Sequence, residues 1–295
     1  VIRKDKNKFK YFTHLSTGNY HFKTARQYTD LSLFTCSKEI GLDANSLLNF
    51  ITGSNHLNQG AESYQDKQSP KLKHLIISPF NLRNFINNKI NQLIIESKKN
   101  IPCSITAKMN ALVDKTIIEN LYKASQHGIK VRLIIRGICC LRPGVKGLSE
   151  NIEVISILDR FLEHSRIVHF NMGSKNEVYL SSADWMTRSM DRRIEILYPI
   201  YDSDLIKRIT DEILEICWND NQTSTQLQED GTYIRKHNKL QKKIRAQESF
   251  IELARKSGLK SIPYEKAIYH NHIKKGNRPI LQTKTLAKKN TYKED

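Results

Sequence analysis

The chain has 295 residues, of which 39% are hydrophobic, and a formal net charge of +18. This length and apolar content predict one large or two modest globular domains and exclude a chain that is disordered throughout. No apolar run approaches the roughly 18–20 residues that a membrane span needs. The N-terminus, VIRKDKNKFKYF, lacks the apolar core of a signal peptide.

The positive charge is distributed unevenly. Residues 235–295 hold 17 Lys or Arg against 5 Asp or Glu, so this stretch alone carries most of the surplus. A surplus of this size favours polyanionic partners, which include nucleic acid, phosphate chains and acidic lipid. The five cysteines form no CxxC pair and no even framework, which favours a reducing, cytoplasmic location.

The first 70 residues divide into three parts. Residues 1–35 are predicted to form strand, turn and strand, with Gly/Asn turn chemistry at 16–19. Asp43 is predicted to cap a short helix that follows it. Residues 53–70 are polar, have no period and end in proline, which predicts a linker.

After the linker, strands and helices alternate. The predicted strands are 72–78, 104–110, 129–137 and the segments IEVISI, HSRIVHF, EVYLSS and RIEILYPI. The predicted helices begin at Ser78-Pro79, at Asp114 (closed by Gly128) and at Asp204, the last running to Trp218. This alternation predicts an α/β unit whose sheet is at least partly parallel.

The stretch FLEHSRIVHF contains the first candidate for chemistry. In an extended strand, His164 and Arg166 would point to the same face. An isolated pair of this kind is more often an ordinary half-exposed strand face. Arg136 favours the functional reading, because it ends the apolar central strand, where open α/β sheets place their ligands. An arginine is costly to bury there without an anion or carboxylate.

Further polar residues end the neighbouring predicted strands. Ser181 and Ser182 provide small hydroxyl donors, and Arg188, Arg192 and Arg193 crowd a short loop. The planar guanidinium group matches phosphate oxygens in pairs. Together with His164, these residues predict a site for an anion with several oxygens.

His14 and Tyr28 are weaker candidates. His14 lies in THLSTGN, where a solvated loop histidine is the alternative. The run STGN is similar to SSAD at 181–184, since each is a small polar run after a predicted strand that could bind an anion. This similarity suggests two related half-sites. Tyr28 would most often be a packing residue, and base stacking is its functional alternative.

Four long strings resemble the C-terminal part of bacterial polyphosphate kinase of the long, ATP-dependent type. They are THLSTGNYHFKTARQYTDLSL, LVDKTIIENLYKASQHGIKVRLIIRGICCLRPGVKGLSENI, DRFLEHSRI and VYLSSADWMTRSMDRRIEI. The resemblance implies an α/β fold with a phospholipase D-like mixed sheet flanked by helices. It divides the chain into the end of a first phospholipase D-like domain (1–52), the linker (53–70), a second such domain (71–234) and a basic tail (235–295), helical and partly disordered.

The resemblance also implies a function. Family members reversibly transfer the γ-phosphate of ATP to inorganic polyphosphate through a phosphohistidine, require Mg²⁺ and form homo-oligomers. Carried over by position, His164 and His14 are expected to be catalytic and Tyr28 to contact the nucleotide, ATP or ADP. The expected phosphate-binding residues are Arg136, Arg193, Arg166, Ser181 and Ser182.

The chain departs from the family pattern at its start. The nucleophilic histidine and most Mg²⁺ ligands are expected upstream of Val1, and one expected partner is this N-terminal part on another chain. A second hypothesis is therefore a catalytically inactive fragment that binds polyphosphate or another polyanion. A third, a phospholipase D-like phosphodiesterase using His164 alone, ranks last because that chemistry normally needs two histidines.

Overall fold

A computed structural model describes residues 1–6, 8–53, 69–236 and 242–256. The chain divides into one compact unit of residues 1–249 and a second of residues 250–295. Most of the predicted linker and most of the predicted tail therefore lie outside the described residues.

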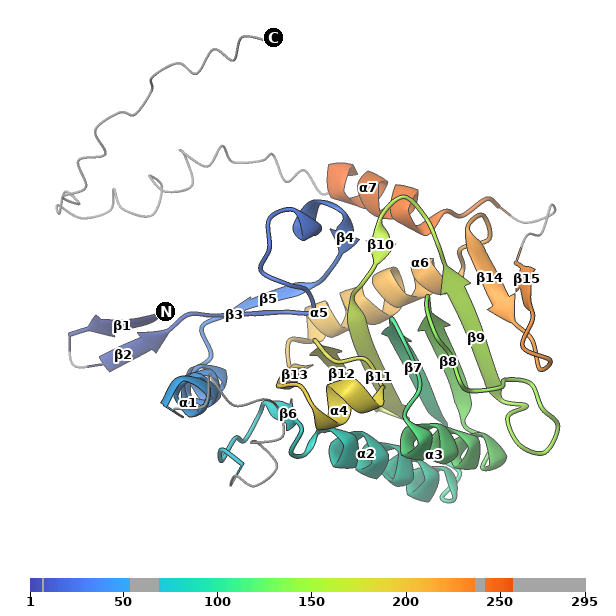
Figure 1. Cartoon of the computed structure of the whole chain (residues 1–295), viewed down its shortest axis with the longest axis horizontal. Helices are drawn as coiled ribbons and strands as arrows, with labels where there is room; N and C mark the ends of the chain where they lie inside the picture. The colour runs from blue at the N-terminus through green and yellow to red at the C-terminus, as the bar shows by residue number, and fades with distance from the viewer. Residues whose placement is uncertain (7, 54–68, 237–241, 257–295) are drawn as a thin grey trace, which may run out of the picture. The chain divides into compact units, whose positions relative to one another are not determined.

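A mixed sheet forms the centre of the first unit (Figure 1). Its strands are β6 (Ile76–Ser78), β7 (Cys103–Met109), β8 (Lys130–Ile135), β9 (Ile152–Ile157), β11 (Arg166–Met172), β12 (Lys175–Ser181), β13 (Glu195–Ile200), β14 (Ser224–Leu227) and β15 (Tyr233–Arg235). Within the described residues their order is β15-β14-β9-β8-β7-β11-β12-β13-β6. Strands β7, β8 and β9 are parallel and the other pairs are antiparallel. The predicted α/β fold with a partly parallel sheet is confirmed.

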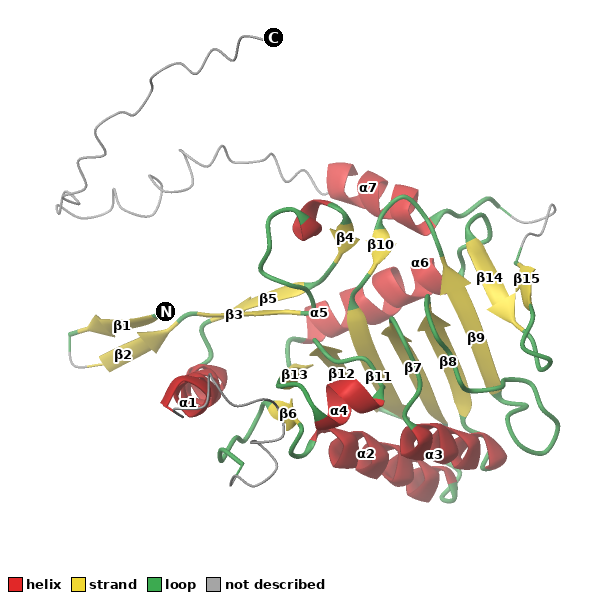
Figure 2. Ribbon diagram, in the orientation of Figure 1, coloured by secondary structure: helices red, strands yellow, loops and turns green. Residues whose placement is uncertain are grey.

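Two amphipathic helices cover one face of the sheet (Figure 2). Helix α2 (Leu82–Ser97) and helix α3 (Lys115–Gln126) bury apolar side chains at the three-to-four-residue spacing of a helix face. Asp114 caps α3 as predicted, since its carboxylate accepts the backbone N–H of Ile117 at 3.1 Å. These side chains and the facing strand residues form one apolar core.

A helical run covers the opposite face (Figure 2). It consists of α5 (Ser203–Lys207), a π-helical segment (Arg208–Leu214) and α6 (Glu215–Trp218), which confirms the helix predicted from Asp204 to Trp218. Two further helices are the short helix α4 (Thr187–Asp191) and helix α7 (Ala246–Lys256).

The first 53 residues form smaller elements. Strands β1 (Ile2–Asp5) and β2 (Lys8–Tyr11) pair with each other, as do β3 (Thr13–Ser16) and β5 (Ser32–Thr35). A short 3₁₀ helix (Thr24–Arg26) leads into β4 (Tyr28–Thr29), which pairs in parallel with β10 (Leu162–Glu163). This pairing holds residues 28–30 against the segment that contains His164.

The predicted helix cap at Asp43 is wrong. Helix α1 runs from Lys38 to Gly53, and the hydroxyl oxygen of Ser37 accepts the N–H of Ile40 at its start. Asp43 lies inside this helix. Its Oδ2 instead accepts the backbone N–H groups of Lys73, His74 and Leu75 at 2.9, 2.6 and 3.0 Å. The presence of an acid at position 43 is therefore explained by three main-chain N–H donors outside the helix.

Several predicted boundaries also shift, and the strand predicted for 72–78 begins only at Ile76. Helix α2 starts at Leu82 and has Asn81 as its N-cap residue. Ser78-Pro79 therefore lies before the helix and does not open it. The strand predicted for HSRIVHF starts at Arg166, so His164 and Ser165 lie in a break between β10 and β11.

Candidate functional site

His164 lies in the break between β10 and β11, where its imidazole is almost buried. Its Nδ1 lies 2.9 and 3.0 Å from the two carboxylate oxygens of Asp30. A carboxylate at Nδ1 favours the proton on that nitrogen and fixes the ring orientation. The break places the backbone N–H of His164 3.2 Å from the carbonyl oxygen of Thr29. The ring is thus fixed by a residue 134 positions earlier in the sequence.

Asp30 is a site residue that the sequence alone did not reveal. The hydroxyl of Thr17 donates to its Oδ1 at 2.7 Å. A Cβ at Gly18 would come within 2.1 Å of its Oδ2, so the turn at 16–19 needs glycine for the carboxylate to fit. The signal was available, since an acid directly follows Tyr28 and Thr29 in QYTD.

Arg166 lies beside His164, as the shared-face prediction required. Its Nη1 lies 3.0 Å from Nε2 of His164 and donates to the carbonyl oxygen of Thr17 at 3.0 Å. Its Nε and Nη2 donate to the two carboxylate oxygens of Asp184 at 3.2 and 3.1 Å. Burial raises the pKa of Asp184, but the charge and hydrogen bonds of Arg166 outweigh it and hold that pKa below its usual value. The Arg166 guanidinium is therefore bound by protein groups, and a phosphate-binding role for it stays a prediction.

Arg136 follows β8 at the carboxyl end of the parallel strands. Its Nε donates to Oδ1 of Asn110 at 2.5 Å. The amide of Asn110 in turn donates to Asp184 at 3.0 Å and to the carbonyl oxygen of His164 at 3.4 Å. Burial lowers the pKa of Arg136, and the charge of Asp184 acts in the opposite direction. Asn110, which the sequence did not single out, thus connects Arg136 to His164.

Arg193 and Ser182 lie at another carboxylate, that of Glu195. Nη1 of Arg193 lies 3.8 Å from Oε1 of Glu195, and its side chain is about half exposed. The hydroxyl of Ser182 donates to Glu195, whereas that of Ser181 donates to the carbonyl oxygen of Ile196 at 2.8 Å. Burial raises the pKa of Glu195, while Ser182 and the charges of Arg166 and Arg193 oppose the shift. Arg193 therefore lies at the edge of the group that contains Arg166.

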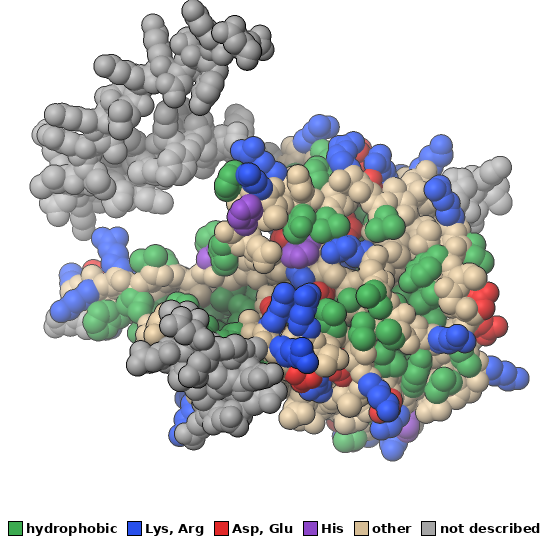
Figure 3. Space-filling view, in the orientation of Figure 1, with side chains coloured by type: hydrophobic (Ala, Val, Ile, Leu, Met, Phe, Trp, Pro, Cys, Tyr) green, Lys and Arg blue, Asp and Glu red, His purple; other side chains and the backbone are tan. Residues whose placement is uncertain are grey.

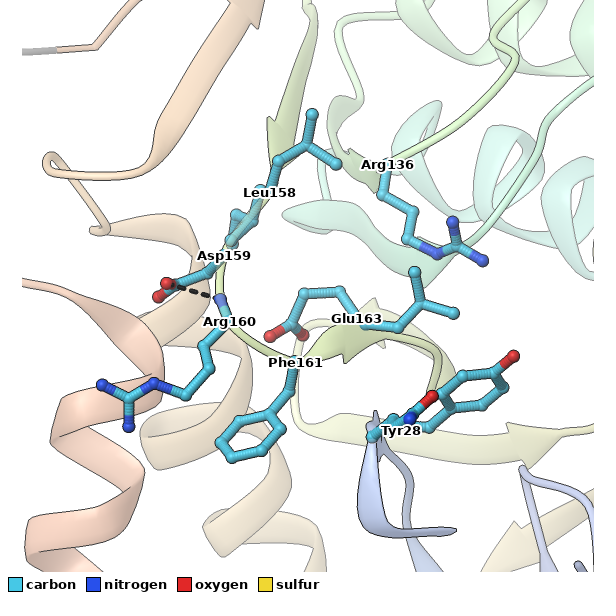
Figure 4. Close-up of a pocket in the computed structure, with 10 residues that line it drawn as sticks. Tyr28, Arg136, Leu158, Asp159, Arg160, Phe161 and Glu163 are labelled. Atoms are coloured by element: carbon cyan, nitrogen blue, oxygen red, sulfur yellow. Dashed lines mark hydrogen bonds between the residues drawn. The ribbon is translucent and has the colours of Figure 1, made fainter. Parts of the chain in front are cut away.

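Tyr28 and Arg136 border a cavity of about 520 Å³. Figure 4 shows these two residues on one side of the cavity and the loop from Leu158 to Phe161 on the other. The ring of Tyr28 also lies beside His164, with 4.8 Å between ring centroids. In the space-filling view, Lys and Arg side chains gather in the middle of the visible face, close to a histidine (Figure 3).

His14 lies away from this cavity. Its ring stacks on Phe34 with 4.1 Å between centroids and meets Tyr20 edge-on at 5.2 Å. It borders a separate cavity of about 650 Å³ that Ser182 also lines. The structure brings together His164, Arg166, Arg136 and Tyr28, and places His14 in a different pocket.

The described residues do not offer a metal centre. No group of three or more His, Cys, Asp or Glu side chains within them could hold a metal ion. The expected Mg²⁺ requirement, with its ligands mostly upstream of the chain, stays a prediction. None of the described helices is long and apolar enough to cross a membrane.

Comparison with known proteins gives a consistent result. Residues 1–57 match the family model "Polyphosphate kinase C-terminal domain 1", and residues 75–247 match "Polyphosphate kinase C-terminal domain 2". The chain is 44% identical over 255 residues to the polyphosphate kinase of Halalkalibacterium halodurans, a match that covers 86% of this chain and 34% of that protein. It is 46% identical over 233 residues to the polyphosphate kinase of Staphylococcus saprophyticus, covering 79% and 31%.

A solved structure supports the same relationship. The crystal structure of polyphosphate kinase from Porphyromonas gingivalis superposes with a TM-score of 0.77 at 35% identity, covering 86% of this chain and 37% of that one. The chain spans about a third of the length of the curated relatives that it matches.

Proposed function

The chain belongs to the polyphosphate kinase family, and from this premise we propose that it forms the acceptor side of the site that reversibly transfers the γ-phosphate of ATP to inorganic polyphosphate. The observation that carries the proposal is the arrangement around His164. Its Nδ1 lies 2.9 Å from the Asp30 carboxylate, and Nη1 of Arg166 lies 3.0 Å from its Nε2 and 3.2 Å from its Nδ1. Arg136 is joined to it through Asn110.

This arrangement suits phosphoryl transfer, which depends mainly on positioning and charge neutralisation. Asp30 orients the imidazole, so that His164 can exchange a proton with a phosphate oxygen. Arg136 and Arg193 are the cations that we assign to phosphate oxygens, since Arg136 is only partly buried and the Arg193 side chain is about half exposed. Arg166 holds positive charge beside the ring and, through Asp184, keeps the site in place.

The nucleotide is assigned to the cavity of about 520 Å³. Tyr28, Phe161 and Leu158 present aromatic and apolar surface for the base, and Arg136 lies at the same cavity for the phosphates. Aromatic rings bind bases by stacking, which contributes about 1–3 kcal/mol per base. ATP or ADP therefore fits the chemistry of the lining.

The remaining requirements of the reaction are assigned to the part of the family chain that precedes the matched residues. We place the phosphohistidine nucleophile and the Mg²⁺ ligands there. A polypeptide that contains this part would complete the site.

A non-catalytic polyanion-binding protein is the second candidate. Residues 235–295, with 17 Lys or Arg against 5 Asp or Glu, favour it because they could bind polyphosphate without any catalytic group. The two candidate functions differ in one requirement. Only the catalytic candidate needs His164 for polyphosphate synthesis.

The test combines this chain with a separately expressed upstream part of the Halalkalibacterium halodurans enzyme, in the presence of γ-labelled ATP and Mg²⁺. We expect no acid-labile phosphohistidine on this chain alone, and polyphosphate synthesis by the mixture. His164→Ala should abolish synthesis. His127→Ala should not abolish synthesis, because His127 is an exposed residue of another segment whose ring contacts the carbonyl oxygen of Lys123.

Two results would contradict the proposal. Acid-labile labelling of the chain alone would show that the nucleophile lies within it. Polyphosphate binding without synthesis, equal in the wild type and in His164→Ala, would favour the non-catalytic candidate.

A further inference from the structure

Residues 242–249, which we call the strap, connect to the site from the C-terminal side. The side chain of Asn221 anchors the strap by two hydrogen bonds of 2.9 Å, one to the carbonyl oxygen of Lys242 and one from the N–H of Ile244. The N–H of Ala246 donates to Asp220 at 2.8 Å. The strap is thus fixed to the segment that follows α6.

The strap then binds the loop that walls the cavity. Nε of Arg245 donates to Asp159 at 2.9 Å. The Gln247 side chain accepts the N–H of Phe161 and donates to its carbonyl oxygen, each at 2.9 Å. One amide therefore satisfies both backbone groups of Phe161, as a neighbouring strand would.

Gln247 also donates to Oε1 of Glu163 at 2.7 Å, in a region closed to solvent. The other oxygen of Glu163 meets Nζ of Lys108 at 3.0 Å and the hydroxyl of Thr29 at 3.2 Å. Glu163 is only 5% exposed, and a buried carboxylate is stable only when it is paired and hydrogen-bonded. Three separate segments thus fix the residue that directly precedes His164.

We propose that the strap is a positioning element of the site, in which Gln247 acts through Phe161 and Glu163 to set the cavity wall and the orientation of His164. The nucleotide half of this inference rests on the proposed function, whereas the orientation of His164 can be tested without any ligand. Gln247 is not itself one of the residues that line the cavity, but it contacts Phe161 and Glu163, which do line it, so it acts through these two residues.

The test compares Gln247→Leu with Gln228→Leu in the full chain. Gln228 is a matched control, because its amide donates to the carbonyl oxygen of Gln226 at the β14–β15 end of the sheet. Nitrogen-15 NMR of the His164 ring reports the Nδ1–H bond to Asp30. A fluorescent ADP analogue, mant-ADP, reports the cavity.

We expect Gln247→Leu to lose the hydrogen-bonded Nδ1–H signal and to weaken mant-ADP binding about tenfold, as for the loss of a buried hydrogen bond. The control should keep both. Retention of the signal together with binding within about twofold of the wild type would overturn the inference.

Two further outcomes are covered. If the wild-type chain does not bind mant-ADP, the nucleotide assignment fails and the NMR signal still decides the positioning role. If Gln247→Leu does not fold, Arg245→Ala replaces it. This variant removes the ion pairs to Asp159 and Glu248 from a side chain that is 39% exposed, and it should change the same two readouts in the same direction.

Discussion

The carboxylate of Asp30 fits only because residue 18 is a glycine. A Cβ at Gly18 would lie 2.1 Å from its Oδ2, so Gly18→Ala should displace Asp30 and leave Nδ1 of His164 without its partner. We expect the His164 ring signals in nitrogen-15 NMR to change as they do in Asp30→Asn. Unchanged His164 signals in Gly18→Ala would show that the turn yields without moving Asp30.

Two partly buried carboxylates near Arg166, those of Asp184 and Glu195, should give the free energy of unfolding opposite dependences on pH. Arg166 holds the pKa of Asp184 below its usual value, so the stability that this group contributes is present above about pH 3.9 and is lost as pH falls through its folded pKa. Burial raises the pKa of Glu195, so its contribution is present below about pH 4.3 and is lost as pH rises through its folded pKa.

Urea unfolding between pH 3 and pH 7 tests these signs. Asp184→Asn should reduce the loss of stability on the acid side, and Glu195→Gln should reduce the loss as pH rises. Changes of the same sign in both variants would mean that one of the two environments is wrongly assigned.

At single residues, the sequence could indicate cations and a histidine but not their partners. His164 and Arg166 were predictable because they are two positions apart. Asp30 and Asn110 reach the site only through tertiary structure, since they lie 134 and 54 positions from His164. No local pattern encodes such contacts.

At the level of elements, the buried pair of Lys108 on β7 and Glu163 on β10 joins two strands. Lys108→Met should destabilise the fold by roughly 3–5 kcal/mol, because it leaves the Glu163 carboxylate buried without its cation. Adding Glu163→Gln removes the uncompensated charge and should restore most of the lost stability. Urea unfolding measures both, and a double variant as unstable as the single one would contradict this assignment.

Asp43 also connects two distant segments, because its carboxylate on helix α1 accepts hydrogen bonds from residues 73–75. Asp43→Ala would leave three backbone N–H groups without their acceptor, at a cost of roughly 1–3 kcal/mol for each that stays buried. Thermal unfolding should show a large fall in Tm. The control is Asp204→Ala, an exposed acid on α5, and equal effects of the two variants would refute the role of Asp43.

The strands and helices after residue 70 could be predicted because apolar periodicity and caps such as Asp114 are local signals. The failures have tertiary causes. Asp43 resembles a helix cap but binds a distant segment, and the strand predicted to include His164 is interrupted where residues 27–30 pair with residues 162–164. The spacing of residue types along the sequence does not show which groups form long-range hydrogen bonds in place of local ones.

For the whole molecule, the parallel strands bring Arg136 to the sheet edge where residues 17–30 close over His164. The two regions that match separate family models therefore meet at this site. The sequence predicted the sheet and its cations. It could not predict that Arg166 and both serines would bind protein groups, because those partners depend on the order of strands.

The binding of inorganic polyphosphate at increasing salt concentration tests the central claim most directly. Arg136→Ala with Arg193→Ala should weaken binding at least about tenfold and reduce its salt dependence. The control, Lys115→Ala with Arg208→Ala, removes two exposed cations on helices and should have little effect. Removal of residues 257–295 should leave the effect of the arginine pair intact. If the arginine pair changes nothing while this removal abolishes binding, the site around His164 does not bind the phosphate chain.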